Sequence, residues 1–199
     1  DGVMRRLAED GVGLQVAGPG EVVPIVPAAV IFDLGRGGDF TARPDATMGA
    51  AAYDAAGDGP VPLGSVGAGT GARAGGLKGG VGSASLVLEE GTTVAALVVV
   101  NAVGSCVDPS TGELYAARYD VVGPLADLVP PHEDEVAAAR QSGESAPSAE
   151  ALGRSLATTV GVVATDADLS KAQCAKVSGI AHDGMARAIR PVHTMVDGD

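Results

Sequence analysis

Apolar residues recur along the chain in short blocks separated by Gly- and Pro-rich segments. Residues 83–88 and 93–100 are apolar runs of strand length joined by Glu-Glu-Gly-Thr, and this pattern predicts a β-hairpin. Residues 160–164 form a third run and predict a buried strand. Residues 22–34 are also apolar, but two prolines predict a broken or edge strand that becomes regular only over 28–34.

Helical patterns occupy much of the remaining chain. The best delimited begins after Ser170, a good N-cap residue, and stops before Pro191. Its expected apolar stripe is Val177, Ile180, Met185 and Ile189. The four predicted helices cover residues 3–9, 44–56, 133–141 and 170–189. Strand pairs that alternate with helices predict an α/β fold in which helices cover apolar sheets, whereas residues 142–148 are expected to form a loop.

Composition limits the kind of protein this is. The 199 residues suffice for a single domain with a real core, and 46% of them are hydrophobic although only 3% are aromatic. A net charge of −12 disfavours nucleic acid and anionic membranes as partners. No apolar run reaches the length of a membrane span. The chain begins at Asp1 without an initiator Met and in the middle of a helical pattern, so we expect a fragment of a longer protein.

Two further features bear on compartment and cofactors. Cys106 and Cys174 are typical of small buried thiols in a reduced, cytoplasmic protein. The three histidines are too far apart in sequence to predict a metal site, so no metal is expected. Residues 67–72 match a relaxed dinucleotide fingerprint, but no strand precedes them and a Gly follows Lys78 where a P-loop needs Ser or Thr. No nucleotide cofactor is expected.

The junction at Thr158 is the strongest chemical feature. A polar stretch, 130–155, runs directly into Thr158-Thr159 and the apolar strand. Self-cleavage of the Ala157–Thr158 bond would free an α-amine beside the Thr158 hydroxyl, and an amine with a pKa near ~7.7–8.0 can accept the hydroxyl proton. Thr is also a common strand residue, so the same pattern fits a strand without chemistry.

Two polar residues interrupt otherwise apolar or small surroundings. Asn101 follows the apolar run 95–100, where its amide could donate to a developing oxyanion or simply belong to a turn. Lys78 lies in the Gly-rich segment 64–82, where small neighbours would allow a substrate to approach. It could hold a negative charge or lower the pKa of a nearby amine, or it could be a solvated loop lysine.

Five segments in order make the chain resemble peptidase family S58. This family includes L-aminopeptidase/D-esterase-amidases, β-peptidyl aminopeptidases and nylon-oligomer hydrolases. The segments are 23–34, 64–80 with Gly76-Leu-Lys-Gly-Gly, 98–104 with Val-Val-Val-Asn-Ala-Val-Gly, 158–166, and 181–193 with Ala-His-Asp-Gly-Met. The resemblance implies an αββα sandwich of the N-terminal-nucleophile type, cut by itself into an α chain (1–157) and a β chain that begins at Thr158.

The resemblance also implies roles for single residues. It makes Thr158 the nucleophile, Asn101 the oxyanion donor and Lys78 a catalytic lysine. It implies that Asp197 and Asp199 activate the threonine. Phe32 and Gly76 complete the expected substrate-binding residues, although Phe32 stands where some members have a Tyr that donates to the oxyanion, and Ala157 stands where Gly or Asn is common.

The expected function is therefore removal of N-terminal residues from peptides, or cleavage of small amides, through an acyl-enzyme on Thr158. A related acyltransferase of the ornithine acetyltransferase kind, with its common Ala-Thr junction, and a homologue that only binds are the alternatives. The expected partners are a small peptide or amide substrate and the protein's own cleaved chain, in an oligomer of cleaved pairs.

Overall fold

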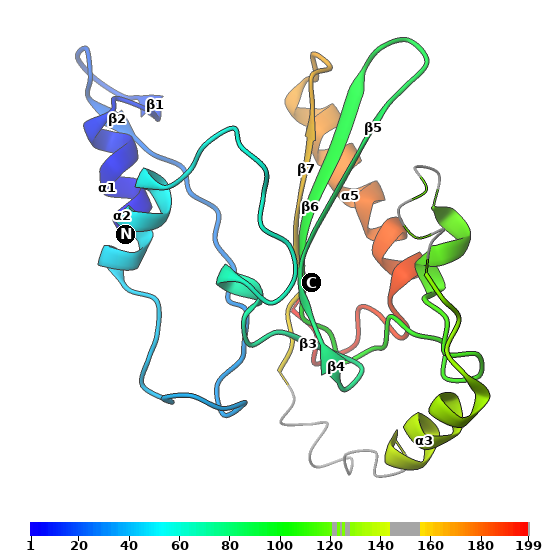
Figure 1. The fold of residues 1–199 in the computed structure, drawn as a ribbon. Helices are drawn as coiled ribbons and strands as arrows, with labels where there is room; N and C mark the ends of the chain where they lie inside the picture. Colours follow the sequence, from blue (N-terminus) through cyan, green and yellow to red (C-terminus); the bar gives the residue numbers. More distant parts are fainter. Residues whose placement is uncertain (121–122, 124, 126–127, 144–155, 199) are drawn as a thin grey trace. The chain divides into compact units, whose positions relative to one another are not determined.

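The computed structural model describes residues 1–120, 123, 125, 128–143 and 156–198 (Figure 1). These residues form two compact units. The first unit combines residues 1–30 with 34–61, and the second combines 31–33 with 62–199. Each unit has its own packing, and the expectation of one hydrolase domain over the whole chain stays a prediction.

The first unit is built on two short helices, α1 (Gly2–Glu9) and α2 (Ala46–Asp54). Asp45 caps α2 by accepting a hydrogen bond from the Met48 N–H at 2.8 Å. Arg6 of α1 reaches Asp54 of α2 at 2.7 Å, and this contact ties the two helices together. The helices predicted over 3–9 and 44–56 are thus confirmed. The second helix is shorter than predicted, with Asp45 and Ala55 as its caps.

The strands of the first unit are much shorter than the sequence suggested. β1 (Leu14–Gln15) pairs with β2 (Val22–Val23), and no strand follows in residues 24–34. The regular strand predicted over 28–34 is therefore wrong. Pro24 and Pro27 lack the N–H that a β-ladder needs, and no strand forms in the residues that follow them either.

The second unit is built on an antiparallel sheet of three strands in the order β5-β6-β7. The predicted hairpin is confirmed as β5 (Gly80–Val87) and β6 (Thr93–Val100), and the predicted third strand as β7 (Val160–Thr165). A small hairpin precedes the sheet, with β3 (Arg73–Ala74) and β4 (Leu77–Lys78). Its two turn residues, Gly75 and Gly76, have φ values of +55° and +86°, which other residues rarely adopt.

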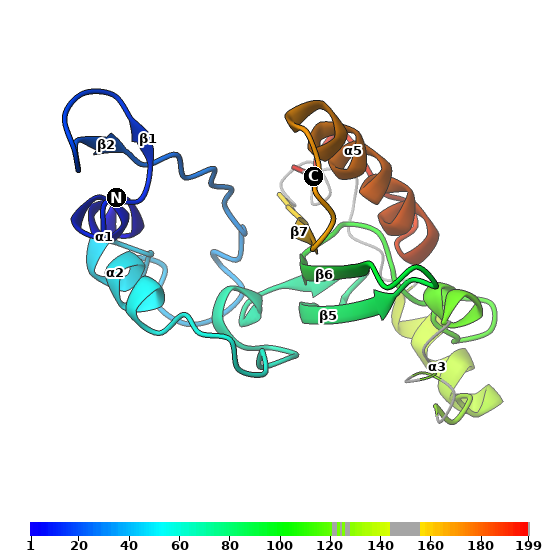
Figure 2. The same cartoon turned by 90° about the horizontal axis from the view of Figure 1, so that it is seen from above.

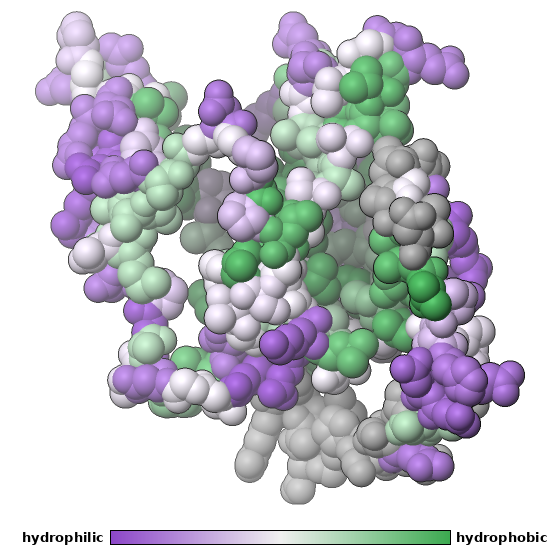
Figure 3. Space-filling model, in the orientation of Figure 1, coloured by the Kyte–Doolittle hydropathy of each residue, from purple (hydrophilic) through white to green (hydrophobic). Residues whose placement is uncertain are grey.

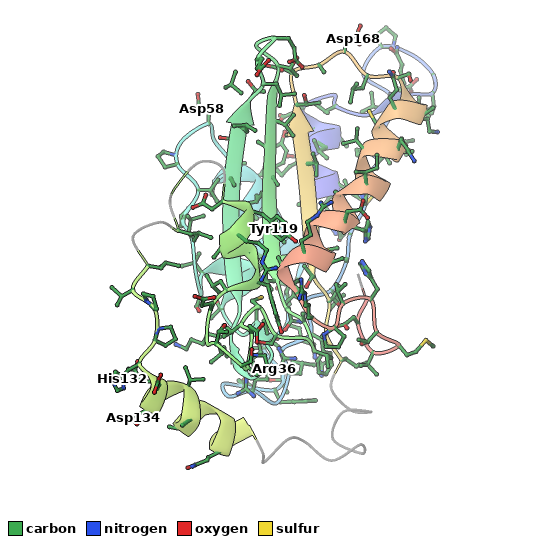
Figure 4. All side chains as sticks on the ribbon, turned by 90° about the vertical axis from the view of Figure 1, so that its right-hand side faces the viewer. Arg36, Asp58, Tyr119, His132, Asp134 and Asp168 are labelled. Atoms are coloured by element: carbon green, nitrogen blue, oxygen red, sulfur yellow. The ribbon has the colours of Figure 1, made fainter. Side chains whose placement is uncertain are left out.

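One face of this sheet is covered by the long helix α5 (Lys171–Ala188), as Figures 2 and 4 show. Ser170 caps α5 through a complete capping box with Gln173. Of the predicted apolar stripe, Ile189 is buried at the end of this helix, whereas Ile180 is 52% exposed. Asp168 lies in the connection between β7 and α5 (Figure 4).

The other face of the sheet carries exposed apolar side chains. Leu97 and Val162 are register partners, which puts them on the same face, and they are 36% and 60% exposed. The strand β7 was expected to be buried, and in this chain it is not. Apolar side chains also reach the surface toward the tip of the β5–β6 hairpin, where Val87 is 63% exposed (Figure 3).

The remaining elements are η1 (Gly67–Gly69), η2 (Tyr115–Tyr119) and α3 (Glu133–Gly143). η2 packs beside α5, with the Arg187 guanidinium 5.9 Å from the centre of the Tyr119 ring (Figure 4). η1 leads into β3 and not into a helix, so the fingerprint at 67–72 lacks the strand–turn–helix context of a dinucleotide site. The predicted helix over 133–141 is confirmed by α3, which also takes in residues 142–143 of the predicted loop. Residues 144–148 of that loop lie outside the described residues.

Three general expectations can be compared with this fold. The mixture of helices and sheet is consistent with the predicted α/β class. Both cysteines are free, as expected, but Cys174 is exposed and not buried. Burial raises the pKa of the Cys106 thiol. Within the described part of the chain, no helix is long and apolar enough to cross a membrane.

Candidate active site

The register of β6 and β7 brings two predicted site residues to the same place. Val99 pairs with Val160 in this antiparallel ladder, so the same register extended beyond the strands sets Asn101 opposite Thr158. The backbone ladder between β6 and β7 ends at the Val99–Val160 pair, and beyond it a side-chain hydroxyl connects the two segments. The Asn101 N–H donates to the Thr159 hydroxyl at 3.3 Å, and both residues are buried.

The Asn101 side chain has a defined orientation. It is fully buried, its Oδ1 accepts from the Arg73 N–H at 3.1 Å, and its Nδ2 donates to the Phe32 carbonyl at 3.2 Å. Because one partner can only donate and the other can only accept, the two ends of the amide are distinguished. Asn101 therefore joins β3 and the segment around Phe32 to the end of β6.

The Ala157–Thr158 bond is held by a segment far away in the sequence. Ala157 is buried and forms an isolated parallel bridge with Asp197. The Ala157 N–H donates to the Val196 carbonyl at 3.1 Å, and the Ala157 carbonyl accepts from the Gly198 N–H at 2.7 Å. Both backbone groups of Ala157 are thus bound by 196–198, directly before the candidate nucleophile.

Asp197 anchors that segment through its carboxylate. Oδ1 accepts from the Val103 N–H at 3.0 Å, just after Asn101 in sequence. Oδ2 accepts from the Thr194 N–H at 3.2 Å and from the Thr194 hydroxyl at 2.5 Å. These bonds fix the residue whose backbone bridges Ala157, although none of them goes to Thr158 itself.

Thr158 is half-buried and lies two residues before the first residue of β7. Its hydroxyl lies close to the backbone of Gly198: a Cβ built on Gly198 would be 2.8 Å from the Thr158 Oγ1. The hydroxyl is therefore packed against the same segment that binds the preceding carbonyl.

Lys78 is linked to this cluster through a short hairpin. It is the register partner of Arg73, and opposite residues in an antiparallel pair project their side chains from the same face. The backbone of Arg73 is bound on both sides. Its N–H donates to Asn101 Oδ1, and its carbonyl accepts from the Ala102 N–H at 2.8 Å. Two exposed positive charges thus share one face of the β3–β4 hairpin, and the backbone of its first strand contacts the buried Asn101.

The remaining predicted residues are less closely connected. Phe32 meets Asn101 through its backbone carbonyl, and this contact does not involve the ring that was expected to bind substrate. Gly76 is exposed at the tip of the β3–β4 turn. Asp199 lies outside the described residues. Among the residues that the structure describes, no group of three potential ligands could hold a metal ion.

Sequence reasoning missed three contributors to this cluster. Thr159, Thr194 and Gly198 contact Asn101, Asp197 and the junction respectively. A Thr followed three positions later by Asp-Gly is a signal for a local turn and could have indicated the Thr194–Asp197 bonds. The approach of Gly198 to Ala157 joins positions about 40 residues apart, and nothing in the local pattern points to it.

Comparison with known proteins supplies a family for this arrangement. The model of the family described as Peptidase family S58 matches residues 1–199. An uncharacterized aminopeptidase of Mycobacterium leprae is 52% identical over the whole chain, which covers 53% of that protein. One of Mycobacterium tuberculosis is 51% identical, again over the whole chain and 55% of its own length.

The name of a more distant relative includes a substrate. The 6-aminohexanoate-oligomer endohydrolase of Paenarthrobacter ureafaciens is 31% identical over 88% of this chain and 48% of its own. The chain thus spans about half the length of the curated relatives it matches.

Proposed function

Since the chain belongs to peptidase family S58, we propose that it is part of a self-processing hydrolase of peptides or small amides, with Thr158 as the nucleophile. The names of the relatives, aminopeptidase and oligomer endohydrolase, support hydrolysis of amide bonds. The observation that carries the proposal is the convergence of Asn101, Asp197 and the segment 196–198 on the Ala157–Thr158 junction.

In the proposed reaction, cleavage after Ala157 frees the Thr158 α-amine. The amine takes the hydroxyl proton as Oγ1 attacks the substrate carbonyl, and the amine of the product leaves. Water then hydrolyses the ester on Oγ1 and regenerates the threonine. In hydrolysis, water accepts the acyl group, whereas an acyltransferase would transfer the acyl group to an amine.

Each neighbouring residue has a proposed part in this reaction. Asn101 supplies an amide next to the nucleophile, and its side chain is already oriented by the Arg73 N–H and the Phe32 carbonyl. A donor of this kind supplies about 2.7–4 kcal/mol of transition-state stabilisation. Lys78, with Arg73 opposite it, supplies positive charge for the developing oxyanion. Asp197 holds the junction in place through the Val103 N–H.

The family's αββα architecture is part of the same proposal. The exposed apolar face marked by Leu97 and Val162 is the surface that a second sheet would cover. Such burial would also enclose the end of β6, where Asn101 lies. An oligomer of cleaved pairs acting on a small peptide or amide, in the cytoplasm, completes the proposal.

The test is an intact-mass spectrum of the purified full-length protein beside its Thr158→Ala variant. We expect two fragments in the parent, one of them beginning at Thr158, and a single uncleaved chain in the variant. The same preparations are then assayed with amino-acid amides, where only the cleaved parent should release the amine. Cleavage and hydrolysis that persist in Thr158→Ala would refute the proposal.

A further inference from the structure

We infer that the backbone N–H of Gly198 is the donor that stabilises the oxyanion on Ala157 during self-cleavage. The inference rests on the proposed attack of Thr158 on the carbonyl before it. It assigns the self-cleavage step a donor other than the Asn101 amide proposed for substrate hydrolysis. The donor belongs to the main chain, so no sequence motif of side chains would reveal it.

The geometry of the Ala157 carbonyl carries the argument. Its oxygen is 2.7 Å from the Gly198 nitrogen, within the 2.7–3.1 Å that a donor to a developing oxyanion requires. Ala157 is only 3% exposed, and a hydrogen bond to negative charge is stronger in such surroundings than in water. A donor already in place before the reaction needs no reorganisation when the charge develops.

The glycine at position 198 has a spatial reason and not a conformational one. Gly198 does not have a positive φ, so the backbone would accept other residues. A Cβ at this position would, however, be 2.8 Å from the Thr158 Oγ1 and 3.4 Å from the Ala157 oxygen. Glycine leaves this space free, so the donor N–H and the Thr158 hydroxyl fit beside the same carbonyl without a shift of either.

The donor is held firmly by its neighbours. Asp197, directly before Gly198, accepts hydrogen bonds from the Val103 N–H at 3.0 Å and the Thr194 hydroxyl at 2.5 Å. On the other side of the bridge, the Ala157 N–H is bonded to the Val196 carbonyl. The carbonyl and its donor are therefore fixed to each other by bonds on both sides, as a preorganised site requires.

The reaction is an acyl shift followed by hydrolysis. The Thr158 Oγ1 forms a bond to the Ala157 carbonyl carbon, and the carbonyl oxygen becomes an oxyanion that faces the Gly198 N–H. The bond from that carbon to the Thr158 nitrogen then breaks, and the hydroxyl proton ends on the nitrogen. Water cleaves the resulting ester into an Ala157 carboxylate and a Thr158 hydroxyl with a free α-amine.

The test replaces Gly198 by glycolic acid in the full-length protein through cell-free translation, which changes the N–H to an ester oxygen and adds no side chain. Removing one oxyanion donor lowers a rate by about 10²–10³-fold, and we expect self-cleavage to slow by a factor of this order. The matched control places glycolic acid at Gly57, an exposed residue of the first unit, and should cleave at the parent rate. Intact mass identifies fragments that begin at Thr158 and separates them from breakage of the new ester.

The outcomes distinguish the inference from the proposal it rests on. If the variant with glycolic acid at position 198 cleaves itself after Ala157 at the parent rate, this N–H has no such role, while Thr158 remains the nucleophile. A parent that never cleaves would remove the proposed function itself. If the Gly198 ester fails to fold by circular dichroism, hydrogen–deuterium exchange of the Gly198 amide is measured in the uncleaved Thr158→Ala protein. Protection of that amide is expected, and exchange at the rate of a free peptide would overturn the inference.

Discussion

Replacing Asn101 by Leu, which has a similar volume, should destabilise the precursor strongly. Asn101 is fully buried, and its amide is bonded to the Arg73 N–H at 3.1 Å and to the Phe32 carbonyl at 3.2 Å. Each buried polar group left without a partner costs about 1–3 kcal/mol, so the loss of both bonds should cost roughly 2–6 kcal/mol. That is a large part of the ~5–15 kcal/mol by which ordinary domains are stable.

The assay is urea unfolding in a Thr158→Ala background, so that self-cleavage does not complicate the transition. Thr159→Val is the matched control because it keeps the shape and removes a single hydrogen bond, the 3.3 Å contact with the Asn101 N–H. We expect a loss of about 1–3 kcal/mol in the control and a clearly larger loss in Asn101→Leu. An unfolding free energy for Asn101→Leu within about 0.5 kcal/mol of the background, the range of neutral surface changes, would refute the reasoning.

Three other predictions follow from contacts of single residues. Lys78→Met should lower kcat/KM for amino-acid amides while the urea midpoint barely changes, because the side chain is exposed; unchanged kinetics would remove Lys78 from the site. Asp197→Ala should cost about 1–3 kcal/mol of unfolding free energy, since the Val103 N–H loses its acceptor, and should also slow self-cleavage seen by mass; a normal rate would contradict its proposed part. The hydrogen bond from the Thr93 N–H lowers the pKa of Asp166, so this contact stabilises the fold above the unfolded-state pKa and is lost as pH falls through the folded-state pKa. The stability difference between the parent and Asp166→Ala should accordingly be larger at pH 6 than at pH 2 in urea unfolding, and an equal difference at both values would argue against a charged acceptor.

The elements with local signals were predictable. The β5–β6 hairpin needs only two neighbouring apolar runs and a short polar turn, and α5 carries both its N-cap and its stop in sequence. The strand expected over 28–34 was not formed, because two prolines upstream remove ladder donors where apolar content alone favoured pairing. The strand β7 was expected to be buried and is not, since burial depends on which element packs against the strand, and the periodicity of its own residues does not reveal that.

The candidate site was predictable in its residues but not in its contacts. Thr158, Asn101 and Lys78 each follow a change in the local pattern, and the family resemblance adds Asp197. That Asn101 lies opposite Thr158 depends on the register of β6 against β7, two strands separated by about 60 residues. A shift of β7 by a single residue would move its side chains to the other face of the sheet, and Thr158 would no longer lie opposite Asn101.

By itself, the sequence determined the kinds of elements in this protein and the candidate nucleophile, because turns, caps and apolar runs act over a few residues. Only the tertiary structure decided that Asp197 and Gly198 meet the Ala157–Thr158 bond, and that the buried amide of Asn101 is occupied by two backbone partners. Those contacts join segments 28 to 69 residues apart. They form because buried N–H and carbonyl groups must find partners wherever the chain brings them together, and a local pattern carries no record of which partner that is.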